Sequence, residues 1–74
     1  MSKKNYWIEF TFTYKEWNSF ENDWVDKKEY ESIEIKCAKK DIDEEVKKNV
    51  NDKLKNQMVK DVKTQIYKYY LLMD

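Results

Sequence analysis

The sequence predicts an α+β fold in which a β-hairpin or small antiparallel sheet is followed by one or two C-terminal helices, in the order ββα(α). Residues 6–14 and 29–38 alternate between apolar and polar side chains, as half-buried strands do. From residue 41 onward, apolar side chains recur at helical spacing. The 74 residues fit one domain over 1–74, of a size that buries only about 60% of its unfolded surface.

The first strand is expected over 6–14, because its residue types are strand formers and its period is two. We expect its even-numbered face in the core: Tyr6, Ile8, Phe10, Phe12 and Tyr14. The second strand is expected over 29–38, with Ile33, Ile35 and Cys37 on the inner face. Antiparallel pairing of the two is the simplest topology.

The segment 15–28 between these strands is open to two interpretations. The sequence contains no glycine and no proline, so turns rely on Asn18-Ser19 and Asn22-Asp23, whose side chains tolerate turn geometry. The segment holds either a short third strand near 20–26 or one helical turn, since three of its aromatic residues are spaced i, i+3, i+7.

The C-terminal half predicts helix. Asp41, with Glu44 three residues later, resembles a capping box. Apolar residues then recur every four positions from Ile42 to Tyr70. Each step overshoots a helical turn by about 40°, so one flat core cannot accept the whole stripe. We therefore expect a helix near 42–50 and another near 52–72, with one long helix completed by a dimer partner as the alternative.

The composition argues against an enzyme. There is no histidine, the commonest general base and metal ligand, and no glycine for a phosphate loop. Cys37, the single cysteine, is expected to be a buried structural thiol. An acid-rich helix start accounts for Asp41, Asp43, Glu44 and Glu45 without a metal. We expect no catalytic residue, no metal and no cofactor.

The location expected from the sequence is cytoplasmic, since one thiol makes no internal disulfide. The longest apolar run, residues 69–73, is far shorter than the ~20 residues of a membrane span. We therefore expect no membrane partner.

Charge is laid out in blocks. Residues 16–34 hold seven acids and two lysines, which gives 2 − 7 = −5, and residues 46–72 hold seven lysines and two aspartates, which gives 7 − 2 = +5. One hypothesis is a small DNA- or RNA-binding protein with a lysine-rich helix on phosphates and a tryptophan for stacking. Its residues would be Lys47, Lys48, Lys53, Lys55, Lys60, Lys63, Lys68 and Trp7.

The favoured hypothesis is a non-enzymatic binding protein that recognises a larger, basic host protein. Aromatic side chains lie inside the acidic block, where a lid over the core explains the rings but not the acids. The predicted partner-binding residues are Trp17, Phe20, Glu21, Asp23, Trp24 and Asp26. A structural homodimer built on residues 52–73 is a third hypothesis.

No family motif is recognised. In general character the chain is similar to small proteins of phages and mobile elements that block host nucleic-acid-processing or defence enzymes, including anti-CRISPR proteins. The shared features are short length, lopsided charge, absence of chemistry and a lysine- and asparagine-rich composition typical of AT-rich genomes. This likeness implies an inhibitor and carries over no residue.

Overall fold

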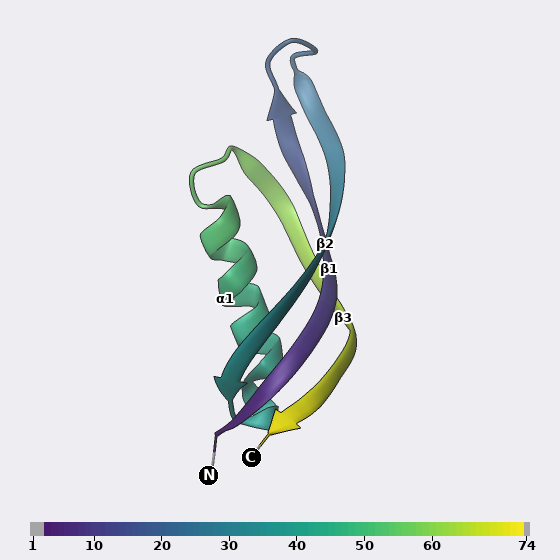
Figure 1. The fold of residues 1–74 in the computed structure, drawn as a ribbon. Coiled ribbons are helices and arrows are strands. Elements are labelled where there is room, and N and C mark those ends of the chain that lie inside the picture. Colours follow the sequence, from purple (N-terminus) through teal and green to yellow (C-terminus); the bar gives the residue numbers. More distant parts are fainter. Residues whose placement is uncertain (1–2, 74) are drawn as a thin grey trace.

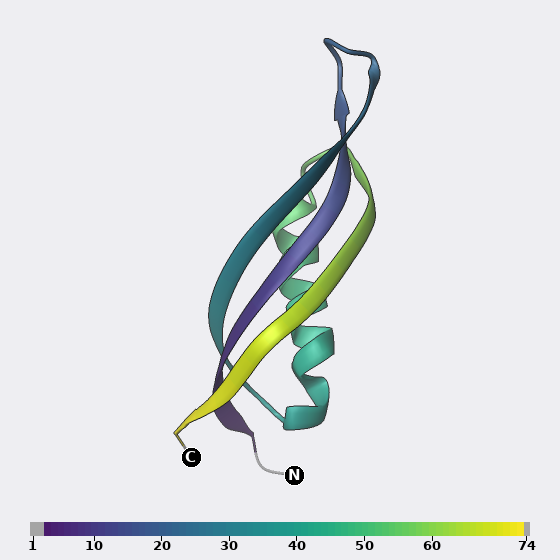
Figure 2. The same cartoon turned by 90° about the vertical axis from the view of Figure 1, so that its right-hand side faces the viewer.

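The computed structural model, which describes residues 3–73, is a three-stranded antiparallel sheet with a helix on one face (Figure 1). The strands are β1 (Lys4–Asn18), β2 (Asp23–Cys37) and β3 (Val59–Met73), in the spatial order β2-β1-β3. A short 3₁₀ turn, η1 (Lys39–Asp41), and the helix α1 (Ile42–Leu54) connect β2 to β3. Figure 2 shows the three strands in one layer with α1 behind them, so the other face of the sheet is open.

The core lies between the central strand and the helix, and the predicted inner face of β1 is confirmed. All five of its even-numbered apolar residues from Tyr6 to Tyr14 are buried, and Ile8 and Phe10 are 0% exposed. The helix contributes Ile42, Val46, Val50 and Leu54. Three steps of four residues rotate this stripe by about 120° in total, which a 13-residue helix can bury on one broad face.

The hairpin is longer than the sequence indicated. Strands predicted over 6–14 and 29–38 extend toward each other until only residues 19–22 form the turn. The Asn18 side-chain oxygen accepts hydrogen bonds from the backbone N–H groups of Phe20 (2.9 Å) and Glu21 (3.2 Å), and Asn22 adopts φ 54°. Asparagine thus takes the place of glycine in this turn. Neither a helical turn nor a third strand forms between 15 and 28.

The first predicted helix is present, but it runs to Leu54 instead of ending near 50. Asp41 occupies the position before its first residue, as expected, although its side chain makes no capping hydrogen bond. The weak helix formers near position 50 do not break the helix, since tertiary packing of Val50 and Leu54 outweighs propensity.

The second predicted helix is wrong, because residues 59–73 form β3. The predicted order ββα(α) is therefore wrong, and so is the alternative of one long helix completed by a dimer partner. The observed order is ββαβ, with the helix inserted before the last strand. The segment is rich in β-branched and aromatic residues, which favour strand. Its 3-4 spacing arises from register shifts opposite Asn5/Tyr6, Glu9/Phe10 and Thr13/Lys15. Each inserts an extra residue, so positions on one face fall three apart instead of two.

The hairpin projects beyond the rest of the fold (Figure 1). Pairing of β1 with β3 ends at Glu16–Val59, whereas pairing with β2 continues to Asn18–Asp23. The molecule is accordingly elongated, with extents of 49 × 18 × 14 Å. The turn lies at one end of the long axis, and the described ends of the chain lie at the other (Figure 2).

Candidate functional site

Five of the six predicted partner-binding residues lie where the hairpin projects past its last pair with β3, and the sixth, Asp26, lies just before that point, opposite Lys15. We call residues 16–26 the hairpin tip. Trp17 and Trp24 are opposite one another across the strands, with ring centroids 5.4 Å apart and an edge-to-face angle of 72°. Both are half-buried. This tryptophan pair lies at the base of the turn and supports it.

The start of β3 holds this base in place. The Lys60 ammonium lies 4.4 Å from the centroid of the Trp24 ring, within the range of a cation–π contact. The Trp17 backbone N–H donates to the carbonyl of Met58 at 3.1 Å. The two tryptophans are therefore structural supports of the hairpin tip as well as part of its surface.

Phe20 is the outermost aromatic residue. Its side chain is 99% exposed, the highest value of any large apolar side chain in the described part of the chain. The backbone that carries it is fixed by the two hydrogen bonds to the Asn18 side chain. A turn with two hydrogen bonds to Asn18 therefore presents the phenyl ring to solvent, outside the core.

The hairpin tip is anionic. Residues 16–26 contain Glu16, Glu21, Asp23 and Asp26 and no lysine, which gives a formal charge of −4. Glu21, Asp23 and Asp26 are exposed. The Lys60 ammonium from β3 lies over Trp24 at this end, and the register places Lys15 opposite Asp26. Carboxylates therefore surround the exposed phenyl ring.

The predicted lysine-rich helix does not exist as one surface. Lys47, Lys48 and Lys53 lie on α1 and Lys55 directly follows it, whereas Lys60, Lys63 and Lys68 lie on β3. Register with Lys15, Thr13 and Glu9 of β1 places the β3 lysines on the open face of the sheet, opposite the helix. The +5 block is thus split between two sides of the molecule.

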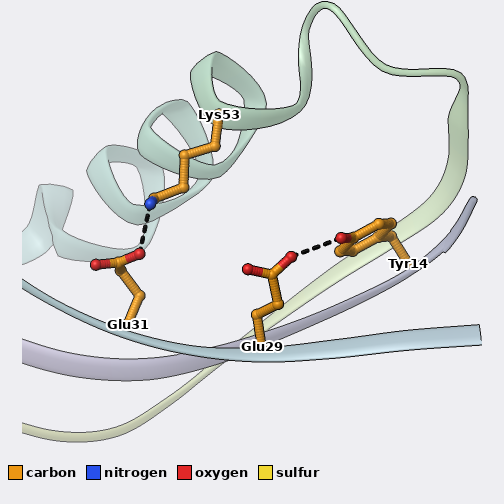
Figure 3. A network of polar contacts seen from close by, with 4 residues as sticks. All are labelled: Tyr14, Glu29, Glu31 and Lys53. Carbon is orange, nitrogen blue, oxygen red and sulfur yellow. Dashed lines mark hydrogen bonds and ion pairs between the residues drawn. The ribbon is translucent and has the colours of Figure 1, made fainter.

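Lys53 is engaged within the fold (Figure 3). Its ammonium lies 2.5 Å from a carboxylate oxygen of Glu31, which joins α1 to β2. Beside it, the Tyr14 hydroxyl donates to the Glu29 carboxylate at 2.5 Å. This hydrogen bond, followed by burial and the negative charge of Glu29, raises the pKa of Tyr14 to about 12. Part of the acidic block therefore fastens the helix side of β2 and does not face a partner.

The open sheet face carries a cluster of aromatic side chains that the sequence did not indicate. Trp7 pairs with Tyr70, and Tyr30 lies opposite Thr11. Lysine ammonium groups lie 5.6 Å from the ring centroids of Tyr30 and Tyr70. Desolvation, followed by neighbouring Glu9, raises the pKa of Tyr67. Only once residues 59–73 are known to be a strand can this grouping be recognised.

The register also gives the charge of the open face. Its lysines are Lys15, Lys28, Lys36, Lys60, Lys63 and Lys68, and its acids are Glu9, Asp26 and Glu34. The sum is 6 − 3 = +3. The open face is therefore basic and aromatic, whereas the hairpin tip is acidic and aromatic.

The remaining groups offer little chemistry. Cys37 is buried, and burial together with Glu45 and Asp41 raises the pKa of its thiol. No cluster of three metal-ligating side chains occurs within residues 3–73. In the same range, no helix has the length and apolar character needed to cross a membrane.

Comparison of the chain with protein-family models, with curated proteins and with solved structures finds no match.

Proposed function

We propose that the chain is a non-enzymatic binding protein that docks its hairpin tip on a larger protein with a basic, pocketed surface. The observation that carries this proposal is Phe20, a fully exposed aromatic side chain at the end of a rigid, projecting turn. Exposed aromatic anchors that enter a partner's pocket supply a large share of binding energy. A turn already held by Asn18 loses little conformational freedom on binding.

The charge of the hairpin tip supports a basic partner. Four carboxylates without a lysine in residues 16–26 would be attracted to lysine- or arginine-rich surface and would speed association. The same carboxylates would repel nucleic acid. Proteins that bind nucleic acid present such basic surfaces. An inhibitor that occupies one of them would agree with the general likeness of this chain to small phage proteins.

The proposal is tested by affinity capture with matched variants. Wild type, Phe20→Ser and Tyr30→Ser are immobilised and exposed to an extract of the cells in which the chain is made. Tyr30 is the control because it is an exposed aromatic residue, 69% exposed, on the open face. We expect a basic protein retained by wild type and Tyr30→Ser but lost with Phe20→Ser.

With that protein purified, Phe20→Ser should weaken binding by about 2 kcal/mol, roughly thirtyfold. Reversing Glu21 and Asp23 to lysine should mainly slow association, and more so at low salt. Equal capture by wild type and Phe20→Ser, or capture lost only with Tyr30→Ser, would reject the hairpin tip as the site.

A second candidate function has its own observation, the open sheet face with Trp7, Tyr30 and Tyr70 and a charge of +3. Aromatic rings on a sheet stack bases of single-stranded nucleic acid, and lysines contact phosphates. The lysines involved would be those of the sheet, not those of α1. Salt-sensitive micromolar binding of an oligothymidylate that is weakened by Tyr30→Ser and unchanged by Phe20→Ser would favour it.

A further inference from the structure

The outer edge of β3 is a strand edge without a neighbour in the described chain. The sheet order β2-β1-β3 leaves one side of β3 facing solvent over residues 59–73. Backbone N–H and C=O groups along such an edge can accept another strand. Its second half has several exposed apolar side chains, among them Tyr69 and Leu71 at 44% and Leu72 at 39%.

The two edges of the sheet differ in how they are protected. Eight of the fifteen residues of β2 are charged, and charge at an edge discourages pairing with other chains. Between Thr64 and Met73, β3 has a single charged residue, Lys68. Its register shifts interrupt pairing with β1 but leave the segment 63–66 regular. The edge of β3 is therefore the open one.

Two hollows lie along this edge on the helix side, and together they are called the groove. One hollow of about 530 Å³ lies between α1 and β3, lined by Ile42 and Asp43 on one side and Ile66 and Tyr69 on the other. A second hollow of about 520 Å³ is lined by Val50 and by Val62 with its neighbours on β3. A strand added to β3 would place every second side chain over these hollows, whose walls combine apolar side chains such as Ile42, Ile66 and Val50 with charged ones.

The alternate side chains of that strand would meet lysines. Lys63 and Lys68 lie on the open face of β3 by register and also line the two hollows, which Lys39 and Lys47 border as well. Against these four lysines the hollows have one acid, Asp43. The surroundings of the edge therefore carry a formal charge of 4 − 1 = +3.

From this arrangement we propose that β3 accepts an extended acidic segment of a partner protein, alternating apolar and acidic residues, as a fourth strand beside α1. Main-chain hydrogen bonds would give affinity, and the groove with its lysines would select the alternation. A second copy fits less well. Two β3 strands, each with three lysines and one aspartate, would bring 2 × (3 − 1) = +4 along one seam.

The test uses the full chain, labelled for NMR, with a synthetic peptide of alternating glutamate and valine about seven residues long, the length of an ordinary strand. A peptide of alternating lysine and valine is the control. We expect the glutamate peptide alone to slow hydrogen exchange of backbone amides in β3 and to leave those of β2 unchanged. Phe20→Ser should bind it as wild type does, which separates this site from the hairpin tip.

A charge reversal with a matched control sharpens the test. Lys63→Glu with Lys68→Glu should weaken peptide binding about tenfold, since two exposed attractions become repulsions. Lys28→Glu with Lys36→Glu, on the opposite strand of the same face, should change it less than about twofold.

Several results would overturn the proposal. These are no protection of β3 at about 1 mM peptide, equal protection by the lysine peptide, and protection that maps to β2. Protection of β3 that grows with protein concentration and without peptide would show that a second copy occupies the edge. The comparison of the two peptides on the wild-type chain needs no variant, so a variant that fails to fold leaves the test intact.

Discussion

At Asp61, the difference in stability between a glycine and an alanine substitution has a sign that depends on whether residues 59–73 form a strand or a helix. Asp61 lies in β3 at a register shift and has φ 54°, a left-handed conformation that disfavours residues with a β-carbon. In the helix expected from the sequence, the same position would favour alanine over glycine. We compare Asp61→Gly with Asp61→Ala, because both remove the same charge and differ only in backbone preference.

The magnitude follows from the conformation. An alanine in the left-handed region costs about 1–2 kcal/mol, from which the greater unfolded-state freedom of glycine subtracts about 0.5–1 kcal/mol. Asp61→Gly should therefore be more stable than Asp61→Ala by about 1 kcal/mol. The control is Lys48, an exposed residue within α1, where alanine should be the more stable by about 1 kcal/mol.

Thermal unfolding followed by circular dichroism measures both differences. For a domain of this size, 1 kcal/mol corresponds to about 4–8 °C in Tm, with opposite signs at the two positions. If alanine were the more stable residue at position 61, as at position 48, the assignment of residues 59–73 to a bulged strand would be wrong.

Three further predictions concern stability. Tyr14→Phe should lower the free energy of unfolding by about 1 kcal/mol at neutral pH in urea denaturation. Because the folded-state pKa of Tyr14 is raised from 10.0 to about 12, this difference should be present below pH 10 and vanish as the pH rises through 12. A difference that stays constant with pH would contradict the hydrogen bond to Glu29. Asn49→Ala should raise the free energy of unfolding by about 1 kcal/mol, because asparagine is a weak helix former and the buried side-chain oxygen of Asn49 has no hydrogen-bond partner within residues 3–73. A lower free energy of unfolding in the variant would show that this oxygen does have a partner. Asn18→Ala should lower the free energy of unfolding by about 1 kcal/mol, because two turn N–H groups lose their acceptor, and unchanged stability would show that the turn does not need this side chain.

The N-terminal half was largely predictable from the sequence. Uninterrupted alternation from Tyr6 to Tyr14 identified both the strand and its buried face, because a period of two has one interpretation when the residues are also strand formers. The start of α1 followed from the change of period at residue 41. The extension of the hairpin was missed because consecutive charged residues near the start of β2, Asp26, Lys27 and Lys28, interrupt the alternation.

The error in the C-terminal half has a specific cause. Val59, Val62, Ile66 and Tyr69 are spaced three and four apart, which is the signature of a helix face. Register shifts opposite β1 produce the same spacing in a strand. Pattern alone cannot separate the two, whereas the β-branched and aromatic content of the segment points to strand. The error also concealed the open sheet face and the edge of β3.

The six residues predicted to form the partner-binding surface do lie together at the hairpin tip, but the sequence could not divide their roles. A pair of tryptophans on opposite strands can support a hairpin or contact a partner. The contacts of Trp24 with Trp17 and Lys60 give it a supporting role, while the full exposure of Phe20 is the reason that residue is proposed as the anchor.

The claim that the hairpin tip is the binding surface is tested most directly by photo-crosslinking at single positions. A benzophenone amino acid replaces Phe20 in one protein and Tyr30, an exposed aromatic residue on the open sheet face, in another. Both are irradiated in an extract of the cells in which the chain is made. We predict that position 20 crosslinks to one larger, basic protein and position 30 does not. A crosslink from position 30 and none from position 20 would contradict the account and move the site to the sheet.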